Sequence, residues 1–221
     1  MIQLIIGLNT EGTTDIRFMQ DIIKRLFEEI AYECKKEIEI YDIIPIKVEK
    51  ENFIQTILNA SKKGLNEFSI SVLCVHADAD GRTTDNVMNN KFNPLLEKIK
   101  DYPSNEYCKY IIPVIPVTMM ESWMLADKDL FKTAINAIGI SNQTLGIEKD
   151  PETYADPKDI IEKAIRKANE GKTKRKRYSM SISELYEYIG KNISLDSLRN
   201  LSSFSHFEEY SKTTFHDLGY L

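Results

Sequence analysis

The chain has 221 residues, 42% hydrophobic and 29% charged, which suits one large soluble domain, or one domain with a small addition. Its formal net charge of −5 excludes a global basic field for nucleic acid, so such a contact would have to be local. Three cysteines without C-x-x-C spacing favour a reducing compartment, and no apolar stretch is long enough to span a bilayer. No secretory signal is visible, so we expect a cytoplasmic protein without a membrane partner.

The N-terminal residues have the pattern of a strand followed by a helix. Residues 2–8 are an apolar run that predicts the first strand, and Glu11 comes directly after it. Thr13 or Thr14 is the expected N-cap of a helix, with Asp15 near the positive end of its dipole. That helix carries an apolar stripe at spacing four, formed by Phe18, Ile22, Leu26 and Ile30. This is the first half of a βαβ unit.

The next segments repeat the strand and helix pattern. Residues 37–46 alternate weakly and predict a second strand, in which Pro45 indicates an edge position. Residues 52–63 predict a helix that ends at Gly64. Val72–His76 is a continuous apolar run and predicts the third strand, buried on both faces of a parallel sheet.

Two carboxylates follow the third strand. Asp78 and Asp80 are one residue apart and precede Gly81. They supply hard oxygen ligands beside a tight turn, which suits Mg²⁺ or Mn²⁺. Asp and Gly are also common turn formers, so a plain polar turn is the alternative.

A fourth strand and a further acidic residue come next. Residues 85–100 predict a helix that is clearest after Pro94. Residues 110–117 predict a strand at an edge, or with a bulge, because they contain two prolines. Glu121 follows this strand, and Trp123 close behind it has the character of a core residue.

The rest of the chain reads as helical. We expect helices at residues 127–138 and 160–168 and short helices from 181 to 221. The predicted organisation is an α/β domain over residues 1–140, with a mainly parallel four-stranded sheet between helices. Residues 141–221 are predicted to form a helical C-terminal extension packed on it.

One dense basic block stands out in this acidic chain, at residues 171–178. Its cations are Lys172, Lys174, Arg175, Lys176 and Arg177. A solvated loop and a local anchor for the phosphates of nucleic acid are both open interpretations.

Acidic side chains therefore follow three predicted strands. Glu11, the pair Asp78 and Asp80, and Glu121 would converge, because the carboxyl ends of parallel strands share one edge of a sheet. Crowded carboxylates repel one another unless a cation neutralises them, which favours a divalent metal ion. Such ions activate water and stabilise the oxygens of a phosphoryl displacement.

The arrangement of Glu11-Gly12 and Asp78-x-Asp80 after strands resembles the TOPRIM domain shared by topoisomerases, primases and the overcoming-lysogenization-defect nucleases. Two later stretches resemble a TOPRIM-like family called domain of unknown function 4276. They are Glu121-Ser122-Trp123-Met124-Leu125-Ala126-Asp127 and the ending Leu198…Ser203-Phe204…Phe207.

The resemblance implies a TOPRIM-like sheet and a Mg²⁺-dependent nuclease acting on DNA or RNA. Glu11 would be the general acid/base, Asp78 and Asp80 would hold the metal, and Glu121 and Asp127 would belong to a second metal site. It also implies a partner ATPase and a role in anti-phage defence. The alternatives are a non-catalytic TOPRIM-like module that docks to an ATPase, and another Mg²⁺-dependent phosphotransfer enzyme. There is no GxxxxGK[ST] loop, so ATP hydrolysis by this chain is not expected.

Overall fold

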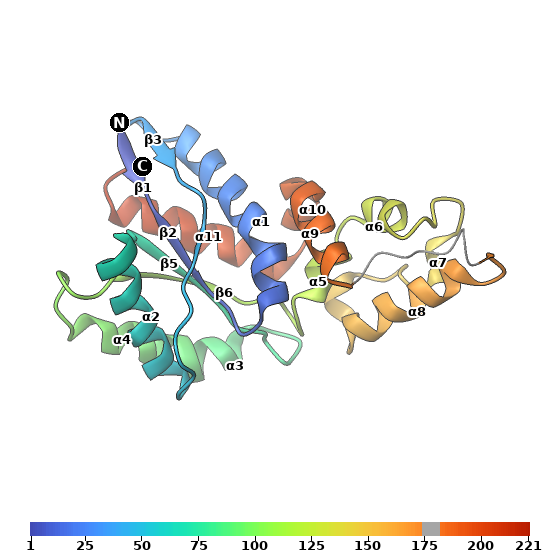
Figure 1. Ribbon diagram of the computed structural model, residues 1–221, viewed down its shortest axis with the longest axis horizontal. Helices are drawn as coiled ribbons and strands as arrows, with labels where there is room; N and C mark the ends of the chain where they lie inside the picture. Colours follow the sequence, from blue (N-terminus) through green and yellow to red (C-terminus); the bar gives the residue numbers. More distant parts are fainter. Residues whose placement is uncertain (174–181) are drawn as a thin grey trace.

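The computed structural model, which describes residues 1–173 and 182–221, has an α/β architecture around a four-stranded, all-parallel sheet. The strand order is β4-β2-β5-β6 (Figure 1). Its strands are β2 (Ile6–Asn9), β4 (Ile44–Pro45), β5 (Val72–His76) and β6 (Tyr110–Val114). The fold class expected from the sequence is confirmed.

The central position of β5 agrees with its apolar sequence. All five of its residues are buried, and it pairs with β2 on one side and β6 on the other. In the register, Asn9 lies opposite Val75 and His76 lies opposite Val114. The ends of three parallel strands therefore lie side by side, and the first predicted strand, which contains β2, is adjacent to the third, as the predicted shared site of Glu11, Asp78 and Asp80 requires.

Each of the first two predicted strands is divided in two. β1 (Ile2–Leu4) pairs with β3 (Ile38–Ile40) in a separate two-stranded sheet, before β2 pairs with β4. The last pair of the first ladder is Leu4 with Ile40, and the first pair of the second ladder is Gly7 with Ile44. Between these pairs one strand advances by three residues and the other by four. The extra residue interrupts the ladder as a bulge does. Pro45 lies in an edge strand, as predicted.

Helices cover both faces of the sheet (Figure 1). On one face, α1 (Thr13–Tyr32) packs against α9 (Ile182–Asn192), and α11 (Ser202–Asp217) packs along β6. On the other face lie α2 (Phe53–Phe68) and α4 (Asn93–Lys100). The apolar stripe of α1 is buried, and residues from both predicted regions of the chain share the core of that face.

The remaining helices are short, apart from α8. Helices α6, α7 and α8 form a lobe beyond the carboxyl ends of the strands (Figure 1). The elements not yet given are α3 (Asp85–Val87), a π-helix (Met88–Phe92), α5 (Glu121–Met124), α6 (Lys128–Ala134), α7 (Asn142–Leu145), a 3-10 turn (Pro151–Thr153), α8 (Pro157–Asn169) and α10 (Leu195–Arg199).

Two helix ends differ from the prediction. α2 continues through Gly64 to Phe68, and its C-cap Ser69 takes the left-handed conformation with φ 55°. A Cβ at Gly64 would overlap Ile70, so this glycine allows close packing instead of ending the helix. The N-cap of α1 is Gly12 instead of a threonine, and the Asp15 carboxylate accepts its N–H at 2.9 Å.

Within the two described ranges, no helix has the length and apolar character needed to cross a membrane.

Candidate functional site

The candidate site lies at the carboxyl edge of the sheet, where three connections leave adjacent strands. β2 leads through Glu11 into α1, β5 leads into Asp78 and Asp80, and the segment after β6 leads into α5. Glu121 is the first residue of α5. The strand order thus carries every acidic residue predicted to follow a strand to the same edge of the sheet.

His76, the last residue of β5, is buried between two carboxylates. Its Nε2 lies 3.1 Å from Oδ1 of Asp78 and its Nδ1 lies 3.4 Å from Oδ2 of Asp15. Burial acts to lower the pKa of His76, but the two carboxylates outweigh it and raise the pKa to about 9. The imidazole is therefore a buried cation at neutral pH, and neither Asp15 nor His76 was among the site residues predicted from the sequence.

Asp15 is held ionised by its surroundings. Burial acts to raise the pKa of its carboxyl, but His76, the Gly12 N–H and the Thr14 hydroxyl lower it below the ordinary value of 3.8. Its place in the first turn of α1 explains the contact with Gly12, because the first N–H groups of a helix lack partners within the helix. The position of Asp15 in the sequence predicts only a favourable interaction with the helix dipole, and nothing in the sequence indicates its contact with His76.

Asp78 and Asp80 have different surroundings. Oδ1 of Asp78 accepts the N–H of Met120 at 2.9 Å as well as facing His76, so it ties the end of β5 to the start of α5. Asp80 has an exposed side chain and a left-handed backbone with φ 51°, a conformation that Asp and Asn tolerate. Its N–H donates to the carbonyl of Thr118 at 3.0 Å.

Glu121 is buried, with 8% of its surface exposed, and accepts a hydrogen bond from the Tyr186 hydroxyl of α9. Burial raises the pKa of Tyr186, and the charges of Glu121, Asp15 and Asp78 raise it further. The C-terminal helices thus contribute a donor to the acidic site. No sequence pattern pointed to Tyr186.

The Tyr186 contact gives a first prediction. Changing Tyr186 to Phe should lower the free energy of unfolding by about 1.5–3 kcal/mol, because the buried carboxyl group of Glu121 would lose its donor. Urea unfolding followed by far-UV circular dichroism measures this loss. Tyr32→Phe is the matched control, since Tyr32 is 93% exposed and should give no change. Equal stability of both variants and the wild type would contradict the role of Tyr186.

Glu11 is exposed at the rim of a hollow of about 260 Å³. The hollow is also lined by His76, Lys50 and Lys91, so it opens directly beside the buried histidine. The Lys50 ammonium donates to the backbone carbonyl of Glu11 at 3.0 Å. Glu11 therefore lies between the acidic edge of the sheet and a basic rim.

The other predicted site residues lie elsewhere. Asp127 is the N-cap of α6: it accepts the N–H of Leu130 at 2.9 Å, and its other oxygen lies 3.4 Å from the Ser197 hydroxyl. Lys172 donates to the carbonyl of Asn136 at 2.8 Å. The other cations of the basic block, Lys174, Arg175, Lys176 and Arg177, lie outside the described residues.

The donor set can be compared with what a metal ion requires. Across residues 1–173 and 182–221, no three His, Cys, Asp or Glu side chains are grouped so that they could hold one ion together. Mg²⁺ does not require such a cage, since it keeps several waters and commonly binds one or two carboxylates plus substrate phosphates. Asp78 and Asp80 provide oxygen donors of this kind, so their chemistry fits Mg²⁺ or Mn²⁺.

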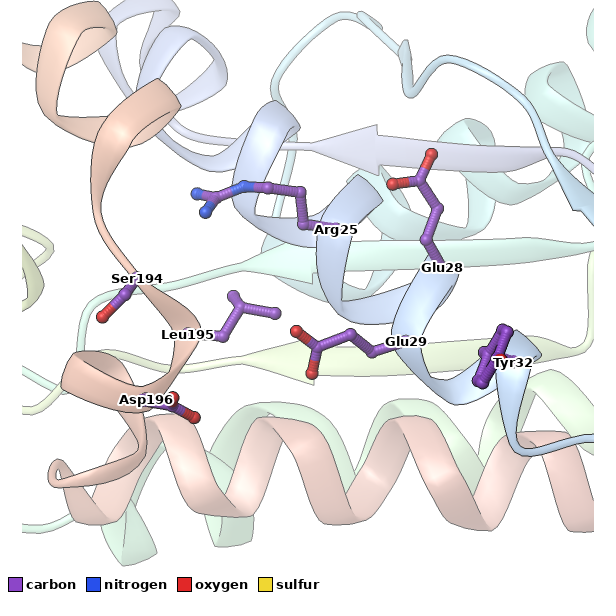
Figure 2. Close-up of a pocket in the computed structure, with 7 residues that line it drawn as sticks. All are labelled: Arg25, Glu28, Glu29, Tyr32, Ser194, Leu195 and Asp196. Carbon is purple, nitrogen blue, oxygen red and sulfur yellow. The ribbon is translucent and has the colours of Figure 1, made fainter.

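A larger hollow of about 560 Å³ lies along the second half of α1, away from the acidic edge (Figure 2). Arg25 crosses it and donates to the carbonyls of Gly190 and Ile193 at 2.8 and 2.6 Å. Glu29, on the same wall, pairs with Arg199 at 2.6 Å. These contacts join α1 to the end of α9, to Ile193 and to α10, which is a structural role.

Comparison with known proteins gives one match. The model of a family described as Domain of unknown function (DUF4276) matches residues 10–210. This span begins directly after β2 and contains β5, β6, α5 and the first part of α11. No curated protein and no solved structure matches the chain.

Proposed function

The chain belongs to the family described as domain of unknown function 4276, and from that premise and the geometry above we propose that it is a divalent-metal-dependent nuclease. It would hydrolyse phosphodiester bonds of DNA or RNA. The observation that supports this most is that acidic residues follow three adjacent strands at one edge of the sheet, beside a hollow with a basic rim.

In this proposal Asp78 and Asp80 hold Mg²⁺ or Mn²⁺. When bound, the ion would supply a polarised water and neutralise charge on the phosphate oxygens. His76 keeps Asp78 oriented, and Met120 fixes the same oxygen from the other side. Glu11 is exposed beside the hollow, where it can accept or donate a proton at the substrate.

In this proposal the buried Glu121 holds α5 against α9 through its hydrogen bond with Tyr186. Its second proposed role is to bind a second metal ion. A partner ATPase, a role in anti-phage defence and a cytoplasmic location are supported only by the family resemblance and the cysteine content. The competing function, a non-catalytic module that docks to an ATPase, predicts no cleavage under any of the conditions below.

The decisive experiment incubates purified protein with end-labelled DNA and RNA, in single- and double-stranded form, with Mg²⁺, with Mn²⁺ or with chelator. Cleavage should require the metal ion. Asp80→Asn should reduce cleavage at least about tenfold, because a neutral amide is a weaker ligand for a hard cation. Asn also tolerates the left-handed backbone of Asp80, so the fold should persist.

Two further variants complete this test. Glu11→Gln should reduce cleavage by about 100-fold or more, the usual contribution of a positioned general acid or base. Glu97→Gln, on the exposed surface of α4, makes the same change of charge away from the site and should cleave like wild type. Cleavage that persists in chelator, or equal activity in all three variants, would overturn the proposal.

A further inference from the structure

Two adjoining hollows open beside Glu11. They measure about 260 Å³ and 210 Å³ and share the stretch from Asn9 to Glu11, with Lys50 and Thr56. Glu11 and Lys50 therefore lie where the two hollows meet. A ligand that enters both would pass directly over the residue proposed as the general acid/base.

Three lysines line these hollows, although the protein as a whole carries a net charge of −5. Lys47 borders the smaller hollow, Lys91 borders the larger one, and Lys50 borders both. His76 also lines the larger of these two hollows. Glu51 also lines it, but its carboxylate accepts a hydrogen bond from Asn59 at 2.9 Å. The lysines are spaced along the two hollows, as successive phosphates of an extended polyanion require.

The hollow of about 260 Å³, the larger of the two beside Glu11, also has an aromatic wall. Phe53 lines it, half-buried, and the ammonium of Lys91 lies 5.6 Å from the centre of its ring. Phe92 packs edge-on against Phe53, with ring centroids 5.2 Å apart, and so supports the ring from behind. A fixed aromatic ring next to a cation is the combination that proteins use to stack a base and bind its phosphate.

We propose that the two hollows are the binding path for a single strand of nucleic acid, with one base against Phe53 and its phosphates on Lys47, Lys50 and Lys91. Each hollow has room for about one nucleotide, and in a duplex the base faces are already stacked, so none would reach Phe53. This inference rests on the proposed function, because it defines the substrate of the same site as single-stranded.

The experiment measures binding without cleavage. Fluorescence anisotropy in the presence of chelator compares a short labelled single strand, as DNA and as RNA, with the matched duplex over a salt series. The triple variant Lys47→Ala, Lys50→Ala and Lys91→Ala should weaken single-strand binding and flatten the log–log salt slope by about 2, at about 0.7 per phosphate contact. A triple variant of the exposed Lys35, Lys98 and Lys100 makes the same change of charge elsewhere and should keep the wild-type slope.

Phe53→Leu tests the aromatic contact separately. It keeps an apolar side chain in the core, and it should lower single-strand affinity by about fivefold or more through lost stacking. Its effect on duplex binding should be small. Equal binding of single strand and duplex, or unchanged affinity and slope in the lysine triple variant, would overturn the inference.

The outcomes distinguish this inference from the proposed function. Metal-dependent cleavage that is unaffected by the lysine and Phe53 changes would leave the nuclease proposal intact and remove the path. Specific single-strand binding without cleavage in Mg²⁺ or Mn²⁺ would support the path and remove the nuclease.

Discussion

Replacing Trp123 with alanine is expected to lower the free energy of unfolding by about 3–5 kcal/mol, the usual cost of truncating a buried aromatic side chain. Trp123 is fully buried, with Phe204 and Phe207 of α11 at centroid distances of 5.2 and 6.2 Å. Its Nε1 donates to the hydroxyl of Ser203 at 2.7 Å. The change would leave a cavity between α5 and α11 and remove the donor to that hydroxyl.

Chemical unfolding followed by far-UV circular dichroism measures this effect, since the variant loses the single tryptophan of the chain. Trp123→Phe is the graded comparison: it keeps the aromatic packing, loses the hydrogen bond and should cost less than the alanine change. A loss below about 1 kcal/mol for Trp123→Ala would contradict the packing role.

Replacing His76 with glutamine is expected to lower the free energy of unfolding by about 3 kcal/mol at neutral pH in chelator, because it leaves Asp15 and Asp78 without their buried cation. Glutamine keeps polar atoms and some of the volume, so the change removes mainly the charge. His206→Gln is the matched control, since His206 lies on the exposed surface of α11. Equal losses in both variants would contradict the ion-pair role of His76.

The contact between His76 and Asp15 also predicts that the free energy of unfolding depends on pH. The pKa of His76 is raised in the folded protein from 6.5 to about 9, so its contribution to stability is complete below pH 6.5 and is lost as the pH rises through 9. The pKa of Asp15 is lowered from 3.8, so its contribution is lost as the pH falls below that value. The stability difference between wild type and His76→Gln should therefore be largest between about pH 4 and 6.5. Urea unfolding at a series of pH values from about 5 to about 10 measures it, and a difference that stays the same as the pH rises through 9 would contradict the assignment.

The sequence by itself determined the fold class, the position of β5 and the acidic residues that follow the strands. These features depend on neighbours within a few positions. A continuous apolar run such as Val72–His76 is stable only when both faces are buried, and the parallel order then carries Asp78, Asp80 and Glu121 to one edge. Their roles in metal binding and catalysis stay predictions.

Only the tertiary structure decided which side chains surround these carboxylates. Tyr186 meets Glu121 across 65 positions of sequence, and Phe53 and Lys91 come together from different helices. No periodic pattern in the sequence predicts either contact, because contacts between residues far apart in the chain depend on how the helices pack on the sheet. Gly190 is the clearest case: inside a helix pattern it only weakens the helix, yet a Cβ there would clash with the backbone of Phe18. The close approach of α9 to α1 at Gly190 helps position the helix that carries Tyr186, so the packing of these two helices completes the acidic site.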